Sequence, residues 1–332
     1  MNQKIRIGVL GCASIARRSV IPAIKELYDD FELKAVASRN ELKAKEFAAQ
    51  FGCEAVVGYE NLIARDDIDA LYIPLPTGIH YEWISKAISV GKHVYAEKSF
   101  ASSVVETKSL ISSAAKKNTA LMEGYMFLYH KQQEVVSSMI LEGEIGELRN
   151  FHGCFGFPPL NSDNFRYDES LGGGVIMDAA GYPLRAAYYF CGESLVVQAA
   201  TVFRDIEDTS LWGSAYLSNG LGLGASIAFG FDNTYQCRYE IWGSKGKITS
   251  ERAYTAGANF SPKILFENAT HSKIINIDQD NHFIGAMREF QKIIKVPSRR
   301  QDHYRQILIQ SQAIEDIKTL SKLSFSMRKI TK

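Results

Sequence analysis

The stretch IRIGVLGCASIA (residues 5–16) joins a short apolar run to a glycine turn and then to a helical pattern. Gly11 ends the apolar run, and Ala16 is a small residue in the first helical turn. These positions match the first and last small residues of the fingerprint G-x-G-x-x-G/A, which binds dinucleotides. Ala13 replaces the middle glycine, where a small side chain lets the backbone approach a pyrophosphate. Alone, the stretch fits a plain tight turn equally well, so the neighbouring sequence must decide.

Strand and helix patterns alternate through the first third of the chain. Strand candidates span residues 5–10, 33–37, 70–73, 93–96 and 120–122, and helical patterns span 15–28, 41–51, 80–90 and 104–117. Repeated β-α units predict a parallel, doubly wound sheet. We therefore predict a Rossmann domain over residues 1–124, with a helix N-terminus facing the cofactor phosphates. The residues expected to contact these phosphates are Gly11, Cys12, Ala13, Ser14, Ile15 and Ala16.

The pattern changes near Tyr125. Helical patterns cover 131–141 and 172–190, and strand patterns cover 148–157, 196–203, 210–217, 222–230, 235–242, 246–250 and 273–277. Long strands without intervening helices indicate an antiparallel sheet. Two amphipathic helices, at 283–294 and 302–320, end the chain. The fold class is therefore α/β, and residues 125–332 are predicted to form a second α/β domain with a mostly antiparallel open sheet, which binds substrate and forms oligomers.

Composition argues against several classes of protein. The 38 lysines and arginines balance 37 acidic residues, so the basic excess typical of nucleic-acid and membrane-surface proteins is absent. No apolar run is long enough to span a membrane, and the early strand at 5–10 leaves no room for a signal peptide. The scattered cysteines, at positions 12, 53, 154, 191 and 237, indicate free thiols in a reducing, cytoplasmic compartment. The seven dispersed histidines predict no metal site.

Ser38 and Arg39 follow the second strand candidate. An enzyme that prefers NAD usually has an acidic residue there, which binds the ribose 2′-hydroxyl. A hydroxyl and a planar guanidinium suit a 2′-phosphate instead. We therefore predict NADP(H) as the cofactor, with a solvated loop arginine as the alternative interpretation of Arg39.

Five segments resemble the Gfo/Idh/MocA family, named after glucose–fructose oxidoreductase and inositol dehydrogenase. They are GVLGCA (8–13), PTGIH (76–80), GKHVYAEK (91–98), EGEIGE (142–147) and WGSKG (242–246). Ser99 departs from the family, which usually has proline there. The resemblance covers nearly the whole chain, and it implies a homodimer or homotetramer that associates through the C-terminal sheet.

Two stretches, GCASIARR (11–18) and GYPLRAA (181–187), resemble the dTDP-sugar 3-ketoreductases within this family. The resemblance implies NADPH-dependent reduction of a ketone on a sugar, most simply a nucleotide-linked 3-keto-deoxysugar. Dehydrogenases of free sugars and dihydrodiols share the tyrosine form of the second stretch, so such a dehydrogenase remains an alternative. A non-catalytic dinucleotide-binding regulator is the alternative from another class.

Ketone reduction needs a hydride, which the nicotinamide supplies, and a proton for the developing alkoxide. Tyr182 has a hydroxyl that can donate this proton, and a neighbouring ammonium would assist. Lys98 follows the strand at 93–96, so it lies at the carboxyl end of the sheet, where such folds bind ligands. The resemblance implies the same catalytic roles for Lys98 and Tyr182. Judged without it, a packed tyrosine and a surface lysine would be the better interpretations.

Asp178 precedes Tyr182 by four residues on a predicted helix, so the two share one helix face. Asp178 is expected to hold a sugar hydroxyl or orient Lys98, or else it is a helix-start carboxylate favoured by the dipole. His130 is expected at the surface, with a contact to the substrate as the alternative. The resemblance also implies contacts to the cofactor from Pro76, Thr77, His80, Glu97 and Lys98. A plain helix-start role is the alternative for His80, and a structural role is the alternative for Glu97.

Overall fold

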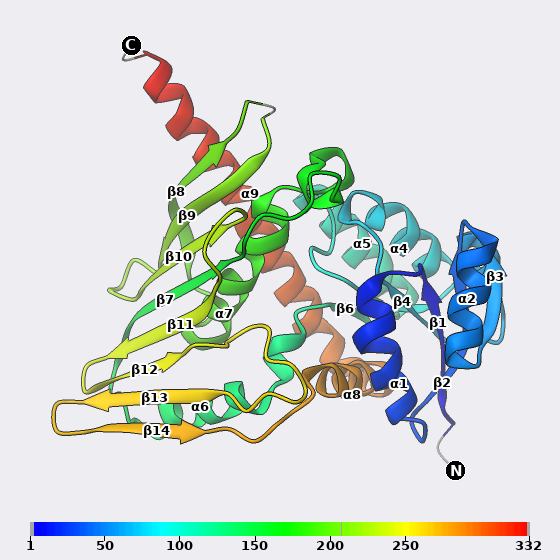
Figure 1. Cartoon of the computed structure of the whole chain (residues 1–332), viewed down its shortest axis with the longest axis horizontal. Helices are drawn as coiled ribbons and strands as arrows, with labels where there is room; N and C mark the ends of the chain where they lie inside the picture. Colours follow the sequence, from blue (N-terminus) through cyan, green and yellow to red (C-terminus); the bar gives the residue numbers. More distant parts are fainter. Residues whose placement is uncertain (1–2, 207, 331–332) are drawn as a thin grey trace. The chain divides into compact units, whose positions relative to one another are not determined.

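The structure is a computed structural model that describes residues 3–206 and 208–330 (Figure 1). The chain folds into two compact units. The first contains the residues up to Gly124 together with Phe283–Ser311. The second contains Tyr125–His282 together with the chain from Gln312 onward. In the described part of the chain, no helix is both long and apolar enough to cross a membrane.

The first unit is built on a six-stranded parallel sheet with the order β3-β2-β1-β4-β5-β6. The strands are β1 (Ile5–Leu10), β2 (Phe31–Ser38), β3 (Glu54–Val57), β4 (Ala70–Ile73), β5 (His93–Ala96) and β6 (Leu121–Glu123). The strand order reverses between β1 and β4, which is where doubly wound sheets bind ligands at their carboxyl ends. The predicted parallel sheet is confirmed, although sequence patterns missed β3, a short edge strand.

Helices connect the parallel strands of the first unit. They are η1 (Ala16–Val20), α1 (Ile21–Glu26), α2 (Glu41–Phe51), α3 (Tyr59–Ile63), α4 (His80–Ser89) and α5 (Val104–Lys117). The side chains of Asn40 and Ser103 accept hydrogen bonds from backbone N–H groups at the starts of α2 and α5. Such caps satisfy N–H groups that have no partner within the helix, so these two starts are well defined.

The first unit is completed by a late segment of the chain, which contains most of α8 (His282–Lys295) and the start of α9 (Arg300–Ile330). Phe290 packs its ring 5.7 Å from that of Tyr95. Tyr304 and Ile307 belong to the apolar core beneath the parallel sheet. The Tyr304 hydroxyl also donates to the Thr119 carbonyl. The expected second domain, residues 125–332, is therefore wrong for 283–311, because this segment buries its apolar side chains in the first unit.

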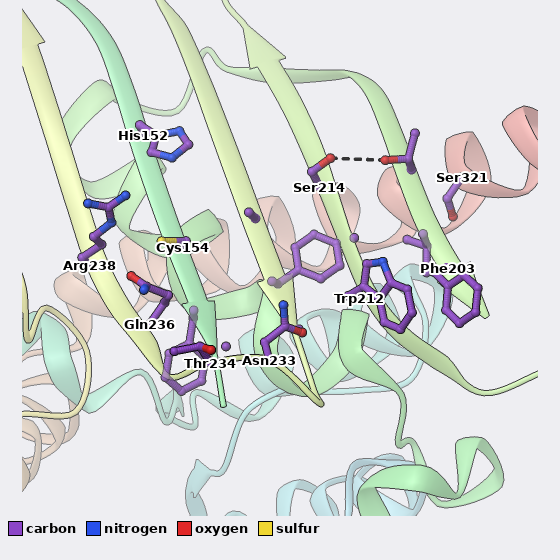
Figure 2. A pocket seen from close by; sticks show the side chains of 18 of the residues that line it. His152, Cys154, Phe203, Trp212, Ser214, Asn233, Thr234, Gln236, Arg238 and Ser321 are labelled. Atoms are coloured by element: carbon purple, nitrogen blue, oxygen red, sulfur yellow. Dashed lines mark hydrogen bonds between the residues drawn. The ribbon is translucent and has the colours of Figure 1, made fainter. Parts of the chain in front are cut away.

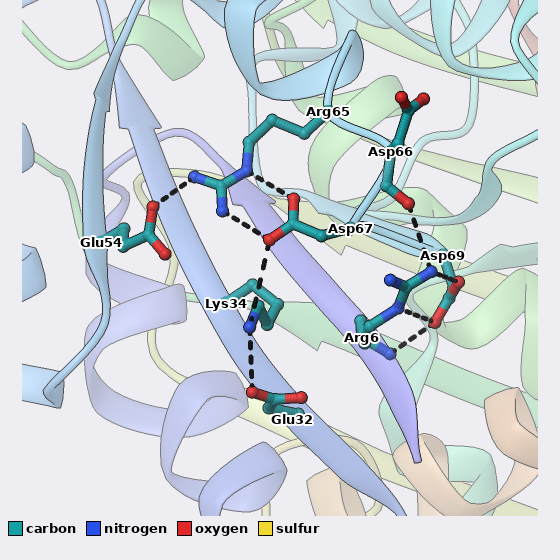
Figure 3. A network of polar contacts seen from close by, with 8 residues as sticks. All are labelled: Arg6, Glu32, Lys34, Glu54, Arg65, Asp66, Asp67 and Asp69. Atoms are coloured by element: carbon teal, nitrogen blue, oxygen red, sulfur yellow. Dashed lines mark hydrogen bonds and ion pairs between the residues drawn. The ribbon is translucent and has the colours of Figure 1, made fainter. Parts of the chain in front are cut away.

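Charged residues form a network near the amino ends of the parallel strands (Figure 3). Arg6 donates to Asp69 at 2.6 Å, and Arg65 donates to Asp67 at 2.6 Å and to Glu54 at 2.6 Å. The hydrogen bond from Arg65 lowers the pKa of Asp67 to about 2. These ion pairs lie at the edge of the sheet opposite to the carboxyl ends, so they leave the ligand-binding edge free of this network.

The second unit is built on an eight-stranded sheet with the order β14-β13-β12-β11-β7-β10-β9-β8. The strands are β7 (Leu148–Gly156), β8 (Val196–Arg204), β9 (Ser210–Ser218), β10 (Gly224–Gly230), β11 (Gln236–Gly243), β12 (Gly246–Ser250), β13 (Lys263–Asn268) and β14 (Ser272–Asn276). Only β7 and β10 pair in parallel. The mostly antiparallel open sheet is therefore confirmed, although β13 was missed.

One face of this sheet is covered by α6 (Lys131–Leu141) and α7 (Gly181–Cys191). A Cβ at Gly153 of β7 would lie 3.0 Å from Pro183, so glycine allows α7 to lie close against the strand. Beside it in β11, the Tyr239 hydroxyl donates to Gln133 of α6 at 2.8 Å. The residues that alternate with these, His152 and Arg238 among them, lie on the opposite face.

Candidate active site

The glycine turn after β1 has the geometry of a phosphate cradle. Gly11 has a φ of +128°, and a Cβ there would lie 2.8 Å from Leu75, so another residue would be strained and crowded. The helix starts at Ser14 and is π-helical from Ala16 to Val20. The first N–H groups of a helix have no acceptor within it, and they carry the positive end of its dipole. The turn therefore fits a pyrophosphate, as its sequence predicted.

The end of β2 lies beside this turn. The Cys12 thiol donates to the Lys43 carbonyl at 3.7 Å, and burial raises its pKa while contacts with Ser38 and Arg17 act to lower it. Burial likewise raises the pKa of Tyr59, and the neighbouring guanidinium of Arg39 opposes this effect. Several cationic side chains thus gather where a ribose attached to the pyrophosphate would lie. This positive surrounding fits a 2′-phosphate better than a bare hydroxyl.

His80 links two loops that follow neighbouring strands. It is fully buried, with Nε2 2.7 Å from the Leu75 carbonyl oxygen and Nδ1 3.0 Å and 3.2 Å from those of Ser99 and Phe100. Burial lowers the pKa of His80, although the carbonyl oxygens act to raise it. Because both ring nitrogens contact backbone oxygens, His80 holds the two loops together. Its contact with the cofactor stays a prediction, and Pro76 and Thr77 lie in one of the loops that it holds.

Glu97 and Lys98 follow β5 directly and are both half-buried. The Tyr72 hydroxyl donates to Glu97 Oε1 at 2.7 Å, which fixes the Glu97 side chain. Lys98 lies close enough to His80 for its charge to lower the pKa of that imidazole. The Lys98–Ser99 peptide bond is cis, at the position where the sequence has serine rather than the family's proline. The structure thus places Lys98 at the carboxyl end of the parallel sheet, as predicted.

Tyr182 lies in the second unit, on the second residue of α7, within a group of aromatic rings. Its side chain is 8% exposed, and its ring centroid lies 4.7 Å from that of Phe155, 5.7 Å from Tyr125 and 6.0 Å from Tyr254. Edge-to-face and tilted contacts of this kind fix the plane of an aromatic ring. The Tyr182 hydroxyl is therefore held in a defined direction, which a positioned proton donor requires.

Gly181, immediately before Tyr182, has no room for a side chain. A Cβ there would lie 2.1 Å from the Tyr125 hydroxyl oxygen and 3.0 Å from Cζ of the same ring. The backbone φ of Gly181 is −59°, so the glycine is required by contact and not by conformation. This contact limits how closely the start of α7 can approach Tyr125. It therefore also determines where Tyr182, the next residue of the helix, lies.

Asp178 lies one turn before Tyr182, in a π-helical segment (Ile176–Ala180). Its side chain is 13% exposed, and its Oδ2 accepts from Arg166 Nε at 2.9 Å. Asp178 is therefore engaged by a specific partner, which a helix-start position alone did not predict. Sequence reasoning missed Arg166, because nothing in the local pattern of residues 160–174 indicates which way its side chain points.

His130 is fully buried and its Nδ1 accepts from the Gln132 N–H at 3.1 Å at the start of α6, so its expected surface position is wrong. The ring of His282, which is also buried, lies 6.0 Å from that of His130. Among the residues that the structure describes, no cluster of histidine, cysteine and acidic side chains could hold a metal ion.

A parallel sheet whose order reverses beside a phosphate cradle, with a lysine at its carboxyl end, is typical of a dinucleotide-binding domain and is compatible with an oxidoreductase. Comparison with protein families supports this interpretation of the fold and identifies the family. Residues 5–125 match the model of the oxidoreductase family with an NAD-binding Rossmann fold, and residues 134–249 match the GFO/IDH/MocA C-terminal domain. The chain belongs to the GFO/IDH/MocA family of oxidoreductases, which confirms the predicted family.

Individual relatives are similar over most of their length. A dTDP-3,4-didehydro-2,6-dideoxy-alpha-D-glucose 3-reductase of Saccharopolyspora spinosa is 42% identical over 296 residues, 89% of each chain. The 3-ketoreductase KijD10 of Actinomadura kijaniata, solved with NADP and TDP-benzene, is 35% identical with a TM-score of 0.92 and covers 96% of this chain and 98% of its own. An NADP(+)-dependent D-xylose 1-dehydrogenase of Haloferax volcanii is 32% identical over 272 residues, 81% of this chain and 82% of its own.

We predict that replacing Gly181 with alanine will impair both stability and turnover. The new methyl group would overlap the Tyr125 hydroxyl, and such overpacking costs about 1–3 kcal/mol. The melting temperature should fall by several degrees, measured by circular dichroism. Adding Tyr125→Phe should restore part of the loss, because the next ring atom lies 3.0 Å away.

Gly257→Ala is the matched control for this test, since no atom lies within 4 Å of a Cβ at that position. It should melt close to the unsubstituted protein. A Gly181→Ala variant that is as stable and as active as the control would show that the contact with Tyr125 does not constrain α7.

Proposed function

We propose that this chain is an NADPH-dependent reductase of a nucleotide-linked 3-keto-deoxysugar. The observation that carries the proposal is its similarity, at 34–42% identity over most of both chains, to four enzymes named as dTDP-3,4-didehydro-2,6-dideoxy-glucose 3-reductases. The D-xylose dehydrogenase, at 32%, is the basis of the second candidate function, oxidation of a free sugar. The higher identities and the TM-score of 0.92 to KijD10, a 3-ketoreductase solved with NADP and TDP-benzene, favour the first.

The cofactor-binding residues belong to the first unit. The N–H groups after Gly11 would bind the pyrophosphate, and Ser38 and Arg39 would bind the 2′-phosphate. Arg17 and Lys43 act on the Cys12 thiol in the same region and add positive charge. Arg17 itself pairs with Glu46 at 2.6 Å, so its charge is partly neutralised. Arg39 is therefore the residue on which the preference for NADP(H) should depend most.

We predict that Arg39→Gln will weaken NADPH binding about tenfold or more and leave NADH binding within about twofold, because the guanidinium would pair with the 2′-phosphate, which NADH lacks. Nicotinamide fluorescence titration with each cofactor measures this. Arg288→Gln, an exposed arginine of the same unit, is the control and should bind both cofactors normally. Equal losses for NADPH and NADH in the Arg39 variant would assign Arg39 to folding instead of to cofactor choice.

The chemical step would use three side chains, those of Lys98, Tyr182 and Asp178. Bound NADPH supplies the hydride to the ketone carbon. The Tyr182 hydroxyl would donate the proton to the developing alkoxide, and the Lys98 ammonium would stabilise negative charge on that oxygen and on the tyrosine after transfer. Asp178 would orient the substrate or Lys98. KijD10 was solved with variants of one lysine and of one tyrosine, the same residue types as Lys98 and Tyr182.

We predict that the purified protein will oxidise NADPH when given dTDP-3,4-didehydro-2,6-dideoxyglucose, followed by absorbance. Tyr182→Phe should lower kcat about a hundredfold or more, while NADPH binding stays normal, because only the proton donor is lost. Tyr189→Phe is the matched control, since Tyr189 lies on the same helix and is 41% exposed.

The alternatives give different results in the same assay. Reduction of NADP⁺ by D-xylose, with no reaction of the sugar nucleotide, would establish the free-sugar dehydrogenase. Tight NADPH binding with no turnover of either substrate would indicate the non-catalytic regulator. A protein that binds neither NADPH nor NADH would contradict all three functions.

We also propose that the chain forms a homodimer or homotetramer through the outer face of the eight-stranded sheet. A groove of about 900 Å³ lies along this face, and its lining includes His152, Cys154, Phe203, Trp212 and Arg238. Figure 2 shows these side chains. Phe203 and Trp212 stack at 3.9 Å and are 46% and 40% exposed. Exposed aromatic side chains in a groove of this size are typical of a surface that another chain covers.

We predict that sedimentation velocity will find a dimer or tetramer, and that Trp212→Glu will shift it toward monomer because a charge would be buried in the interface. Leu42→Glu, an exposed apolar residue of the first unit, should leave the assembly unchanged. A monomeric unsubstituted protein would contradict the proposal.

We place the enzyme in the cytoplasm, where sugar nucleotides and NADPH are available. The five cysteines are all free, which suits a reducing compartment. Recovery of the native protein in the periplasmic or secreted fraction of its own cells would contradict this placement.

A further inference from the structure

The segment from Leu160 to Gly174 is a folded loop. In the sequence it immediately precedes the helical segment that carries Asp178 and Tyr182. The Leu160 N–H donates to the Tyr167 hydroxyl at 2.9 Å, and the Gly174 N–H donates to the Arg166 carbonyl at 2.7 Å. A Cβ at Gly173 would lie 2.6 Å from the Arg166 carbonyl oxygen, so the loop closes only with glycine there. These contacts, which involve segments before and after Arg166, therefore restrict the backbone at Arg166.

The loop is also anchored to the sheet. Glu169 Oε1 accepts from the Ser210 N–H at 3.2 Å, from the Ser210 hydroxyl at 3.0 Å and from Arg204 at 3.1 Å. Ser210 begins β9, so the loop is fastened to the rigid part of the second unit. This anchor is independent of Asp178, because none of its three contacts involves the helix.

Arg166 makes a further side-chain contact of the loop, with Asp178. Its Nε donates to Asp178 Oδ2 at 2.9 Å, and its guanidinium lies 4.8 Å from the centre of the Phe165 ring. Its Nη1 also donates a hydrogen bond to Asn164 Oδ1 at 3.4 Å. The Asp178 side chain is largely buried, and ionised groups in such places need charged partners. Arg166 thus fixes one oxygen of Asp178 from a backbone that is itself held in place.

We infer that Arg166 is a positioning residue for the reduction, acting through Asp178. It holds the Asp178 carboxylate in one orientation, on the helix face that Asp178 shares with Tyr182. Arg166 itself would touch neither substrate nor cofactor. The inference rests on the proposed function, because it assumes that Asp178 orients the substrate or Lys98 during turnover.

A double-mutant cycle on kcat and KM tests this inference with Arg166→Gln, Asp178→Asn and the double variant. If Arg166 acts through Asp178, Arg166→Gln should lower kcat about tenfold, and the double variant should be no slower than the slower single one. The Kd for NADPH should stay within about twofold. Arg166→Lys, which keeps the charge but not the planar fork, should give an intermediate kcat, and it replaces Arg166→Gln in the cycle if that variant does not fold.

Arg204→Gln is the matched control, because it loosens the same loop at its other anchor without touching Asp178. Its kcat should stay within about twofold of the unsubstituted enzyme. A drop equal to that of Arg166→Gln would assign the effect to the loop as a whole and overturn the inference. Losses that multiply in the double variant, or an unchanged kcat in Arg166→Gln, would overturn it too.

Failure of the proposed function gives a different result. If the unsubstituted enzyme oxidises D-xylose but does not reduce the sugar nucleotide, that function is wrong, and the same cycle on xylose oxidation decides the role of Arg166. If it turns over neither substrate, both proposals are overturned, since no reaction remains for Arg166 to support.

Discussion

The pairing of β1 with β2 on one side and β4 on the other is the constraint on which the first unit depends. Both neighbours run parallel to β1, so each connection must cross over a face of the sheet, and the chain leaves β1 and β4 in opposite directions. The segments that follow β1 and β4 therefore diverge at the carboxyl ends of these two strands. Gly11 makes its turn there, and Ser38 and the loop held by His80 follow the neighbouring strands. The cofactor-binding residues are brought together by strand order and not by closeness in sequence.

In the second unit, the positions of Tyr182 and Asp178 depend on close packing of α7 against one face of the open sheet. Gly153 brings α7 near β7, and Gly181 brings the start of α7 near Tyr125. Between these two contacts the Tyr182 ring is enclosed by other aromatic rings, and Asp178 is held by Arg166. Rigid elements place reacting groups more accurately than loops do. The glycines thus serve the candidate site although they carry no chemical group.

Much of this could be predicted from the sequence, because periodic apolar patterns and the fingerprint at Gly11 are local signals. The prediction failed where the determining contacts are distant. The strand β3 is short and half exposed at a sheet edge, so its residues lack the alternation of a strand. The amphipathic pattern of 283–311 shows that one face is buried but not in which unit. His80 and Arg166 have roles set by partners 19 and 12 residues away, through side-chain directions that no sequence pattern encodes.

The late segment that completes the first unit has a consequence for synthesis of the protein. A ribosome releases the residues of all six parallel strands before it makes Phe290, Tyr304 and Ile307, which fill gaps in the core of that sheet. The parallel sheet therefore leaves the ribosome with part of its apolar surface uncovered, and it stays so while the whole second sheet is translated. The order of elements along the chain thus leaves the cofactor-binding unit, although its strands are the first to emerge, incomplete until residues 283–311 have been made.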